Sequence, residues 1–317
     1  MAALSDHLLA VTILTYLLAM LGYAAEYAFG TRSAVGRVAA RELVPAGVTA
    51  GPTGAAPAEP APPRDRAELA GRLAVAVTAL GLAVHVATLV TRGLAAHRVP
   101  WGNMYEFVLT LCLVGATAWL VLLARRPSAR PLGLFVTLAL VVLLGIAGMV
   151  LYAPVGPLPP ALNSYWLKIH VTAAATASGI LLVGFLAAAM TLVRSGYEAG
   201  KRRFPYSLGE RMPTAEGLER LTFRVHAFAF PVWTLAIMCG AIWAEAAWGR
   251  YWGWDPKETW SFIAWVIYAG YLHARATPSV KRTTATWIAV LGWAAMMVNL
   301  YGVNLVISGL HSYAGVK

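Results

Sequence analysis

Charged residues are scarce in this 317-residue chain, of which Asp, Glu, Lys and Arg make up only 12%. A soluble domain carries about 25% charged and about 45–50% apolar residues. Here the hydrophobic share is 59%, and the mean hydropathy is +0.64. The composition excludes an ordinary soluble enzyme and a disordered chain, and it predicts an all-α polytopic integral membrane protein.

Cysteine and acidic residues are also few. Cys112 and Cys239 cannot build a disulfide framework, and both lie in apolar runs where we expect small buried hydrophobes. There is no CxxCH motif, and no nucleophile or general acid is evident.

The net charge of +11 would suggest a nucleic-acid partner in a soluble protein. In a membrane protein it indicates basic cytoplasmic loops, so we expect no nucleic-acid partner.

Long apolar runs dominate the chain. A spanning helix needs about 20 mostly apolar residues. The sequence predicts eight transmembrane helices, at residues 8–29, 67–91, 103–124, 131–151, 165–193, 221–244, 256–275 and 283–307.

Basic residues concentrate in alternate connections between these helices. The connections 30–66, 125–130, 194–220 and 275–282 hold 17 of the 25 Lys and Arg residues. Cytoplasmic loops are enriched in positive charge. We therefore expect these four connections in the cytoplasm, both termini outside, and the protein in the cytoplasmic membrane.

The chain divides into three regions by composition. Residues 1–30 form a first transmembrane helix, and 31–66 a flexible cytoplasmic linker, with six prolines within 45–63. Residues 67–317 form the main transmembrane domain, whose distinctive segment is 243–260. We expect the charged segment 195–220 to be a solvated surface.

Tryptophan is concentrated in one short external segment. Six of the 12 tryptophans fall within residues 243–265: Trp243, Trp248, Trp252, Trp254, Trp260 and Trp265. An interfacial aromatic belt explains enrichment at helix ends. It does not explain Trp248, Trp252 and Trp254 in a polar loop with Gly249 and Gly253. Flat side chains held by glycine turns suit a flat apolar ligand, so we favour a planar-ligand platform, with the belt as the alternative.

Two predicted helix starts carry residues that are typical of helix capping. Asp255, followed by Pro256 and Glu258, predicts an N-cap with a capping box. Asn103 with Glu106 repeats this pattern, and for these two we expect pure capping.

His170 and His311 stand at similar depth on the external side. His170 lies one to two turns into a helix that begins outside, and His311 follows the last helix. A lone histidine at a helix end is usually structural. Two of them beside an aromatic platform favour metal ligation, because a haem needs two axial ligands and an apolar slot.

His273 lies near the opposite face of the membrane. It stands 17 residues after Pro256, which at about 1.5 Å per residue is about 26 Å deeper. An ionisable residue there is a functional candidate, with interfacial anchoring beside Arg275 as the alternative.

The other four histidines have simpler expectations. His226 is expected at the inner interface, with a second inner ligand as the alternative. His85 is expected as a hydrogen-bonded core residue, and His7 and His97 as exposed residues.

Several segments together resemble one family. WGRYWGWD followed by PKETW resembles the WWD motif of membrane haem-handling proteins. WLKIHV around His170, YLHAR around His273, GVNLVISGLHSYA around His311, and NMYEF at 103–107 extend the likeness to the CcsA/ResC family (named CcsB in some bacteria) of the system II cytochrome c synthase. The resemblance is strong from about residue 160 to 315.

The resemblance implies a set of roles. His170 and His311 would be axial ligands of an external haem b, bound non-covalently as cargo on Trp248, Trp252, Trp254 and Asp255. His273 would ligate a haem inside the membrane, with a second histidine from a separate ResB/Ccs1-like membrane subunit. His226 departs from the family pattern.

The function implied is cytochrome c biogenesis. The protein would carry haem outward and present it to apocytochrome c, whose CxxCH thiols, kept reduced by other proteins, add to the haem vinyl groups. It would then be a subunit of a holocytochrome c synthase. Two alternatives stay open: a haem exporter or relay without ligation activity, and a di-haem electron-transfer subunit.

Overall fold

A computed structural model describes residues 1–30, 66–158, 162–307 and 309–311. Within these ranges all regular structure is helical, which confirms the all-α prediction. Most of the predicted linker 31–66 lies outside the described residues, so its expected flexibility stays a prediction.

Eight long helices follow one another, each close to a predicted span. They are α1 (Ala2–Phe29), α3 (Arg66–Ala96), α4 (Met104–Arg125), α5 (Gly133–Met149), α6 (Tyr165–Glu198), α7 (Ala215–Trp248), α8 (Pro256–Ala276) and α9 (Arg282–Met297). The 3-10 helices η1 (Pro127–Leu132) and η3 (Tyr206–Gly209) connect some of them. After α9 the chain continues through a π-helical turn, η4 (Val298–Gly302), into α10 (Val303–Val306).

Seven spans in the described part of the chain are long and apolar enough to cross a membrane. These are α1, α3, η1 with α5, α4, α6, α7, and α9 through α10. α8 is the predicted eighth, and its 21 residues would reach about 30 Å. It falls short in apolar character because charged or polar side chains stand at both ends, among them Lys257, Glu258 and Arg275.

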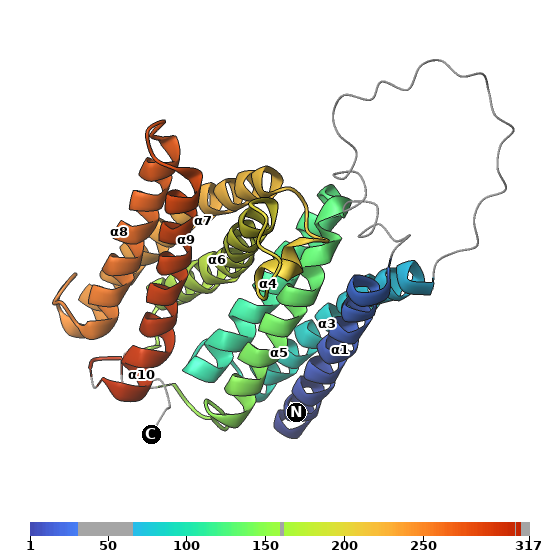
Figure 1. Cartoon of the computed structure of the whole chain (residues 1–317). Helices are drawn as coiled ribbons and strands as arrows, with labels where there is room; N and C mark the ends of the chain where they lie inside the picture. The colour runs from blue at the N-terminus through green and yellow to red at the C-terminus, as the bar shows by residue number, and fades with distance from the viewer. Residues whose placement is uncertain (31–65, 159–161, 308, 312–317) are drawn as a thin grey trace, which may run out of the picture.

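The helices pack side by side with α6 near the centre, flanked by α4, α7 and α9 (Figure 1). More than half of the residues of α6 are buried, and many are Ala, Gly or Ser. Small residues let helix backbones approach closely where the surrounding lipid gives no hydrophobic drive. α1 and α3 form a second antiparallel pair on the far side of the bundle.

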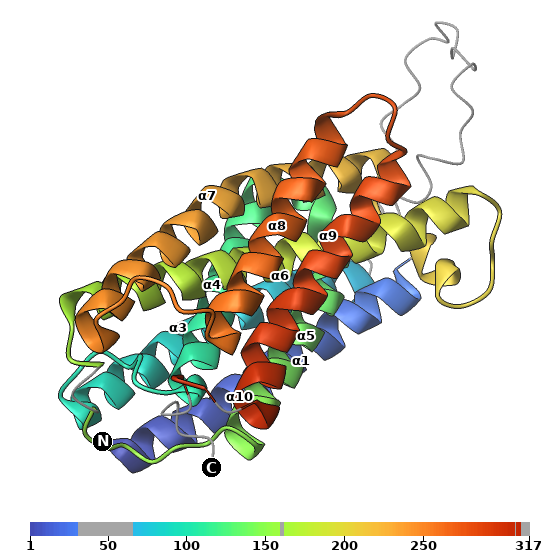
Figure 2. The same cartoon turned by 90° about the vertical axis from the view of Figure 1, so that its left-hand side faces the viewer.

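One end of the bundle gathers four segments that are distant in the sequence. The start of α1, α10, the connection between α7 and α8, and the start of α6 lie at the same end, whereas the turn between α8 and α9 lies at the other (Figure 2). Because the described long helices run alternately up and down, the start of α1 and the end of the α9–α10 segment lie at the same end of the bundle. We refer to this side as the α10 end.

Several helices extend beyond their predicted spans. α6 continues to Glu198 and α7 begins at Ala215, so both ends of the predicted loop 194–220 are helical. Arg194 is buried rather than solvated, and its guanidinium donates to the Gly209 carbonyl oxygen at 2.7 Å. Arg194 directly precedes the segment 195–220 that was expected to be a solvated surface.

Candidate functional site

A pocket opens at the α10 end between α4, α6, α7, α8 and η4. The space between its atoms is about 1220 Å³, including the open mouth. Most of its wall is aromatic or aliphatic: Trp101, Phe107, Leu111, Leu162, Leu167, Val171, Ala174, Trp233, Ile237, Trp243, Trp248, Met296, Met297 and Leu300. Ligand sites of this kind combine apolar walls with a few placed polar groups, and here two of those groups are His170 and His311.

His170 reaches the pocket from the second turn of α6. Its Nδ1 lies 2.8 Å from the carbonyl oxygen of Ala236 on α7. A carbonyl oxygen can only accept, so Nδ1 carries the proton and Nε2 holds the lone pair that binds a metal ion.

Gly240 makes this close approach possible. A Cβ atom at position 240 would lie 2.8 Å from both Nδ1 and Cε1 of His170. Because Gly240 has no side chain, the His170 imidazole can pack directly against the backbone of α7.

His311 is held by Asp255 on the other side of the pocket. Its Nδ1 donates to Asp255 Oδ2 at 2.9 Å, and the backbone amide of Leu310 donates to Asp255 Oδ1 at 2.7 Å. The carboxylate thus fixes both the ring and its backbone, and Nε2 again holds the lone pair. This histidine–carboxylate pairing recurs in metal sites.

The Asp255 carboxylate is ionised at neutral pH. Burial acts to raise its pKa, but the hydrogen bonds from His311, Leu310 and Lys257 outweigh burial and lower the pKa from 3.8 to about 2. For His311, burial lowers the pKa below 6.5, although the hydrogen bond and the negative charge of Asp255 act to raise it. The neutral imidazole, which is the form that binds metal, is therefore favoured.

Trp243 connects the two histidines. Its side chain is 2% exposed, stacks on His170 at 5.9 Å between ring centroids, and meets His311 edge-on at 5.8 Å. Trp248 contacts both Trp243 (4.8 Å) and His311 (5.2 Å). Trp243 belongs to the predicted tryptophan cluster at residues 243–265, but it was not among the predicted haem-binding residues. Helical spacing could have indicated it, because Trp243 follows Gly240 by three residues on α7.

The predicted tryptophan platform is divided in the structure. Trp248 is the last residue of α7, not part of a loop, and Gly249 ends the helix in the left-handed conformation at φ +70°. Trp252 lines the pocket, whereas Trp254 is 65% exposed and does not. Trp254 instead packs edge-on against Trp252 and Phe262.

The predicted capping box at the start of α8 is present. The Asp255 side chain accepts from the Lys257 amide at 3.1 Å, and Glu258 accepts from the Asp255 amide at 3.1 Å. Glu258 also binds the Gly253 amide and Arg250. The connection between α7 and α8 is therefore folded back onto the first turn of α8.

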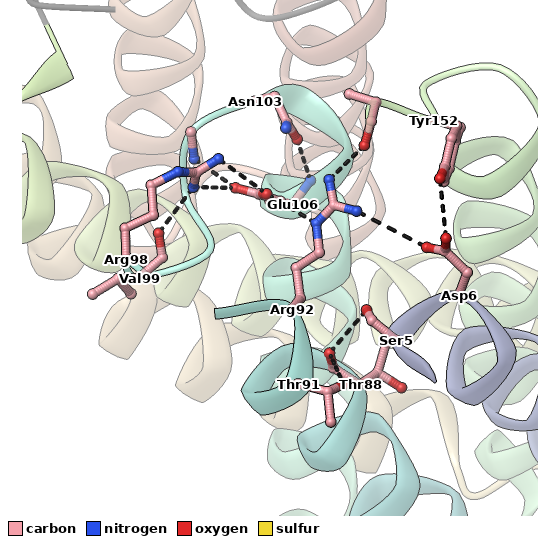
Figure 3. A network of polar contacts seen from close by, with 12 residues as sticks. Ser5, Asp6, Thr88, Thr91, Arg92, Arg98, Val99, Asn103, Glu106 and Tyr152 are labelled. Carbon is pink, nitrogen blue, oxygen red and sulfur yellow. Dashed lines mark hydrogen bonds and ion pairs between the residues drawn. The ribbon is translucent and has the colours of Figure 1, made fainter. Parts of the chain in front are cut away.

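Glu106 holds another wall of the pocket through a buried ionic network (Figure 3). It accepts from Arg92 Nε at 3.0 Å, Arg98 Nη1 at 2.7 Å and the Gly102 amide at 2.8 Å. Gly102 lines the pocket beside Trp101. Asn103 caps α4 as predicted, but for Glu106 the expectation of pure capping is wrong: its partners lie on α3 and in the connection to α4.

His273 lies far from this pocket. It stands in the last turn of α8, opposite the α10 end, and its side chain is exposed. Within the described residues no group of three or more His, Cys, Asp or Glu side chains forms a metal site around it or elsewhere.

His226 is inside the bundle, which corrects its predicted place at the interface. It is 1% exposed, its Nδ1 donates to the Thr222 carbonyl oxygen at 2.8 Å, and its ring packs against Tyr268 and Tyr271. His85 is a buried residue 3.4 Å from the Tyr16 hydroxyl, as predicted. His7 and His97 are exposed, also as predicted.

The fold and the pocket define a multi-pass membrane protein with a histidine-bearing aromatic pocket at one end. The family described as "Cytochrome C assembly protein" matches residues 101–311. The chain is 31% identical to the cytochrome c biogenesis protein CcsA of Cyanophora paradoxa, covering 71% of this chain and 82% of that protein. It is 33% identical to CcsA of Thermosynechococcus vestitus, covering 77% and 86% respectively. The chain belongs to this CcsA family of cytochrome c biogenesis proteins.

A solved structure shares the fold. The cytochrome c haem lyase CcmF aligns with a TM-score of 0.60 at 16% identity, over 94% of this chain and 46% of that one. This chain therefore spans about half the length of that lyase, and the likeness concerns the fold alone.

Proposed function

We propose that this protein binds haem b non-covalently in the pocket at the α10 end and presents it to apocytochrome c. One observation carries the proposal: two imidazoles that are each oriented through Nδ1 face a single aromatic pocket. The residues fit this cargo, because neutral imidazole binds haem iron and tryptophan faces suit a porphyrin. His170 and His311 would be the axial ligands, with Trp243 and Trp248 beside them.

The part played by the chain would be positioning. The carbonyl of Ala236 and the carboxylate of Asp255 hold the two rings. The apolar walls keep water from the iron, and two axial ligands fix the orientation of the macrocycle. The CxxCH thiols of apocytochrome c then add across the haem vinyl groups, and no side chain of this protein enters a covalent step. Catalysis of this kind works by holding reactants in place.

The remaining assignments complete the proposal. Residues 67–317 would be the haem-handling domain, and segment 243–260 its WWD motif. The α10 end would face outward, since the basic connections lie at the opposite end. His273 would ligate an inner haem together with a ResB-like subunit, which its exposed side chain allows. Haem would travel from His273 to the pocket.

Complementation tests the function. The chain would be expressed with a ResB-like partner in a strain that cannot mature cytochrome c. We expect maturation from the wild type and its loss in His170→Ala and His311→Ala. His97→Ala, an exposed histidine at the same end, serves as the control. Haem export without covalent cytochrome c would favour the relay alternative, and full maturation by both pocket variants would contradict the proposal.

Reporter fusions test the orientation. A reporter inserted at Gly200 should be cytoplasmic and one at Gly156 external. The reverse result would place the pocket on the wrong side for apocytochrome c.

A further inference from the structure

Lys257 places an ammonium group in the wall of the pocket. It is the second residue of α8, lines the pocket and is only partly exposed. Its Nζ donates to the carbonyl oxygen of Asn299 at 3.0 Å. Among the described residues, no carboxylate forms an ion pair with this ammonium within 4.0 Å.

The two acidic groups nearest in sequence are already engaged. Asp255 accepts from His311, Leu310 and the Lys257 backbone amide. Glu258 accepts from Arg250 and two backbone amides of the preceding connection. Neither carboxylate is directed at the Lys257 ammonium.

A break in helix geometry positions the ammonium. The π-helical turn η4 interrupts the path from α9 to α10 at Val298–Gly302. Such turns shift backbone bonding from the usual register and are frequent at functional sites. Here the Asn299 carbonyl meets Lys257, while Asn299 Nδ2 donates to Ser261 Oγ at 3.0 Å, and Ser261 donates to the Lys257 carbonyl at 2.7 Å. This closed set of contacts links the ammonium of the lysine to its own backbone carbonyl.

The ammonium retains bonding capacity toward the pocket. An ammonium group has three N–H donors, and Asn299 accepts from one of them. A partly buried charge without a counter-ion is unfavourable, and an anion brought by a ligand removes that cost. The pocket thus combines apolar walls, which suit a flat ligand, with one ammonium group, which suits a ligand edge that carries a carboxylate.

We infer that Lys257 binds a carboxylate of the cargo, so that the carboxylate-bearing edge of the ligand faces α8 and η4. This rests on the proposed function, because haem carries both propionates on one edge and its two vinyl groups away from them. Asp255 binds both His311 and the Lys257 amide, so the iron ligand and the propionate ligand are fixed to a single carboxylate. The lysine would therefore select one orientation of the macrocycle and leave the vinyl groups away from α8.

The test compares haem with its dimethyl ester, in which both carboxylates are blocked. Each compound would be titrated into the purified full-length protein in detergent, and binding read from the Soret absorption. A charge-assisted hydrogen bond is worth about 1.5–3 kcal/mol, so the wild type should bind the free acid about tenfold or more tighter than the ester. In Lys257→Gln the two affinities should become nearly equal, through weaker binding of the free acid alone.

Matched variants separate charge from structure. Lys257→Arg should keep most of the preference for the free acid. Lys168→Gln, which alters an exposed lysine at the same end on α6, should behave as the wild type. If Lys257→Gln does not fold, Lys257→Met keeps the apolar stem and should also show equal affinities.

The possible failures are distinguishable. A wild type that binds neither compound overturns the proposed function and this inference with it. A wild type that binds both compounds equally well overturns the inference alone. The inference also fails if Lys257→Gln keeps the preference or weakens both compounds by the same factor.

Discussion

Replacing Asp255 by Asn tests how the carboxylate orients His311. Asn is about as good an N-cap as Asp, so α8 should still begin at Pro256. The charge is lost, however, and one of the two acceptor oxygens becomes a donor. The new amide side chain has only one acceptor oxygen, so it cannot accept from both the Leu310 amide and His311 Nδ1 as the Asp255 carboxylate does.

The size of the effect follows from the contacts. The hydrogen bonds from His311, Leu310 and Lys257 lower the pKa of Asp255 from 3.8 to about 2 and so favour its ionised form. Carboxylates that orient a ligating histidine typically contribute about 10–100-fold to metal affinity. We therefore expect Asp255→Asn to weaken haem binding by about 10–100-fold.

The assay is a haem titration of the full-length protein in detergent, followed by its Soret absorption. Glu245→Gln is the matched control, because Glu245 is an exposed carboxylate near the same end of α7. Added imidazole should restore much of the binding in Asp255→Asn by replacing the misplaced His311 ring. Unchanged affinity and spectrum in Asp255→Asn would refute the positioning role of this carboxylate.

Further predictions concern the pocket, its supporting network and pH. Gly240→Ala places a Cβ 2.8 Å from two His170 ring atoms and should lower haem retention with little change in expression. Full haem retention would contradict the close packing of the His170 ring against Gly240. Trp243→Ala should reduce haem content more than Trp254→Ala, as measured by pyridine haemochrome assay, because only Trp243 touches both histidines; equal effects would contradict this. Glu106→Gln removes the close ion pairs with Arg92 and Arg98 and leaves buried Arg92 only the 3.9 Å ion pair with Asp6; it should cost about 3–5 kcal/mol in stability, read as a lower Tm than in the exposed control Glu216→Gln, and matching Tm values would refute the role of the network. The pKa of His311 lies below 6.5 and Asp255 stays ionised until the pH nears 2, so haem retention should hold as pH falls from about 8 to 6.5 and be lost only below; loss centred above 6.5 would contradict the lowered pKa.

The helices could be predicted because each depends on local sequence. Each predicted span has a long helix close to it, although α8 is less apolar than the other seven, and Asp255 with Glu258 marked the start of α8 correctly. The ends were less accurate, since α6 and α7 continue through residues whose polarity suggested a loop. Arg194 is buried there only because the chain folds back over it.

The site was predictable in its types of residue and less so in its arrangement. His170 and His311 do reach one pocket, as their common depth indicated. Trp243 and Glu106 were underestimated, because their partners are distant in sequence: His170 and His311 for the first, Arg92 and Arg98 for the second. The contact of Lys257 with the Asn299 carbonyl lies in a π-helical turn that no sequence pattern marked.

The ligation state of bound haem tests the central claim most directly. Low-temperature electron paramagnetic resonance of the ferric haem complex would be recorded for the wild type, His170→Ala and His311→Ala, with His97→Ala as the control. We predict a low-spin bis-imidazole signal in the wild type and the control. Its loss is predicted in both pocket variants, with recovery when imidazole is added. The same low-spin signal in either pocket variant without imidazole would contradict the claim that His170 and His311 together hold the iron.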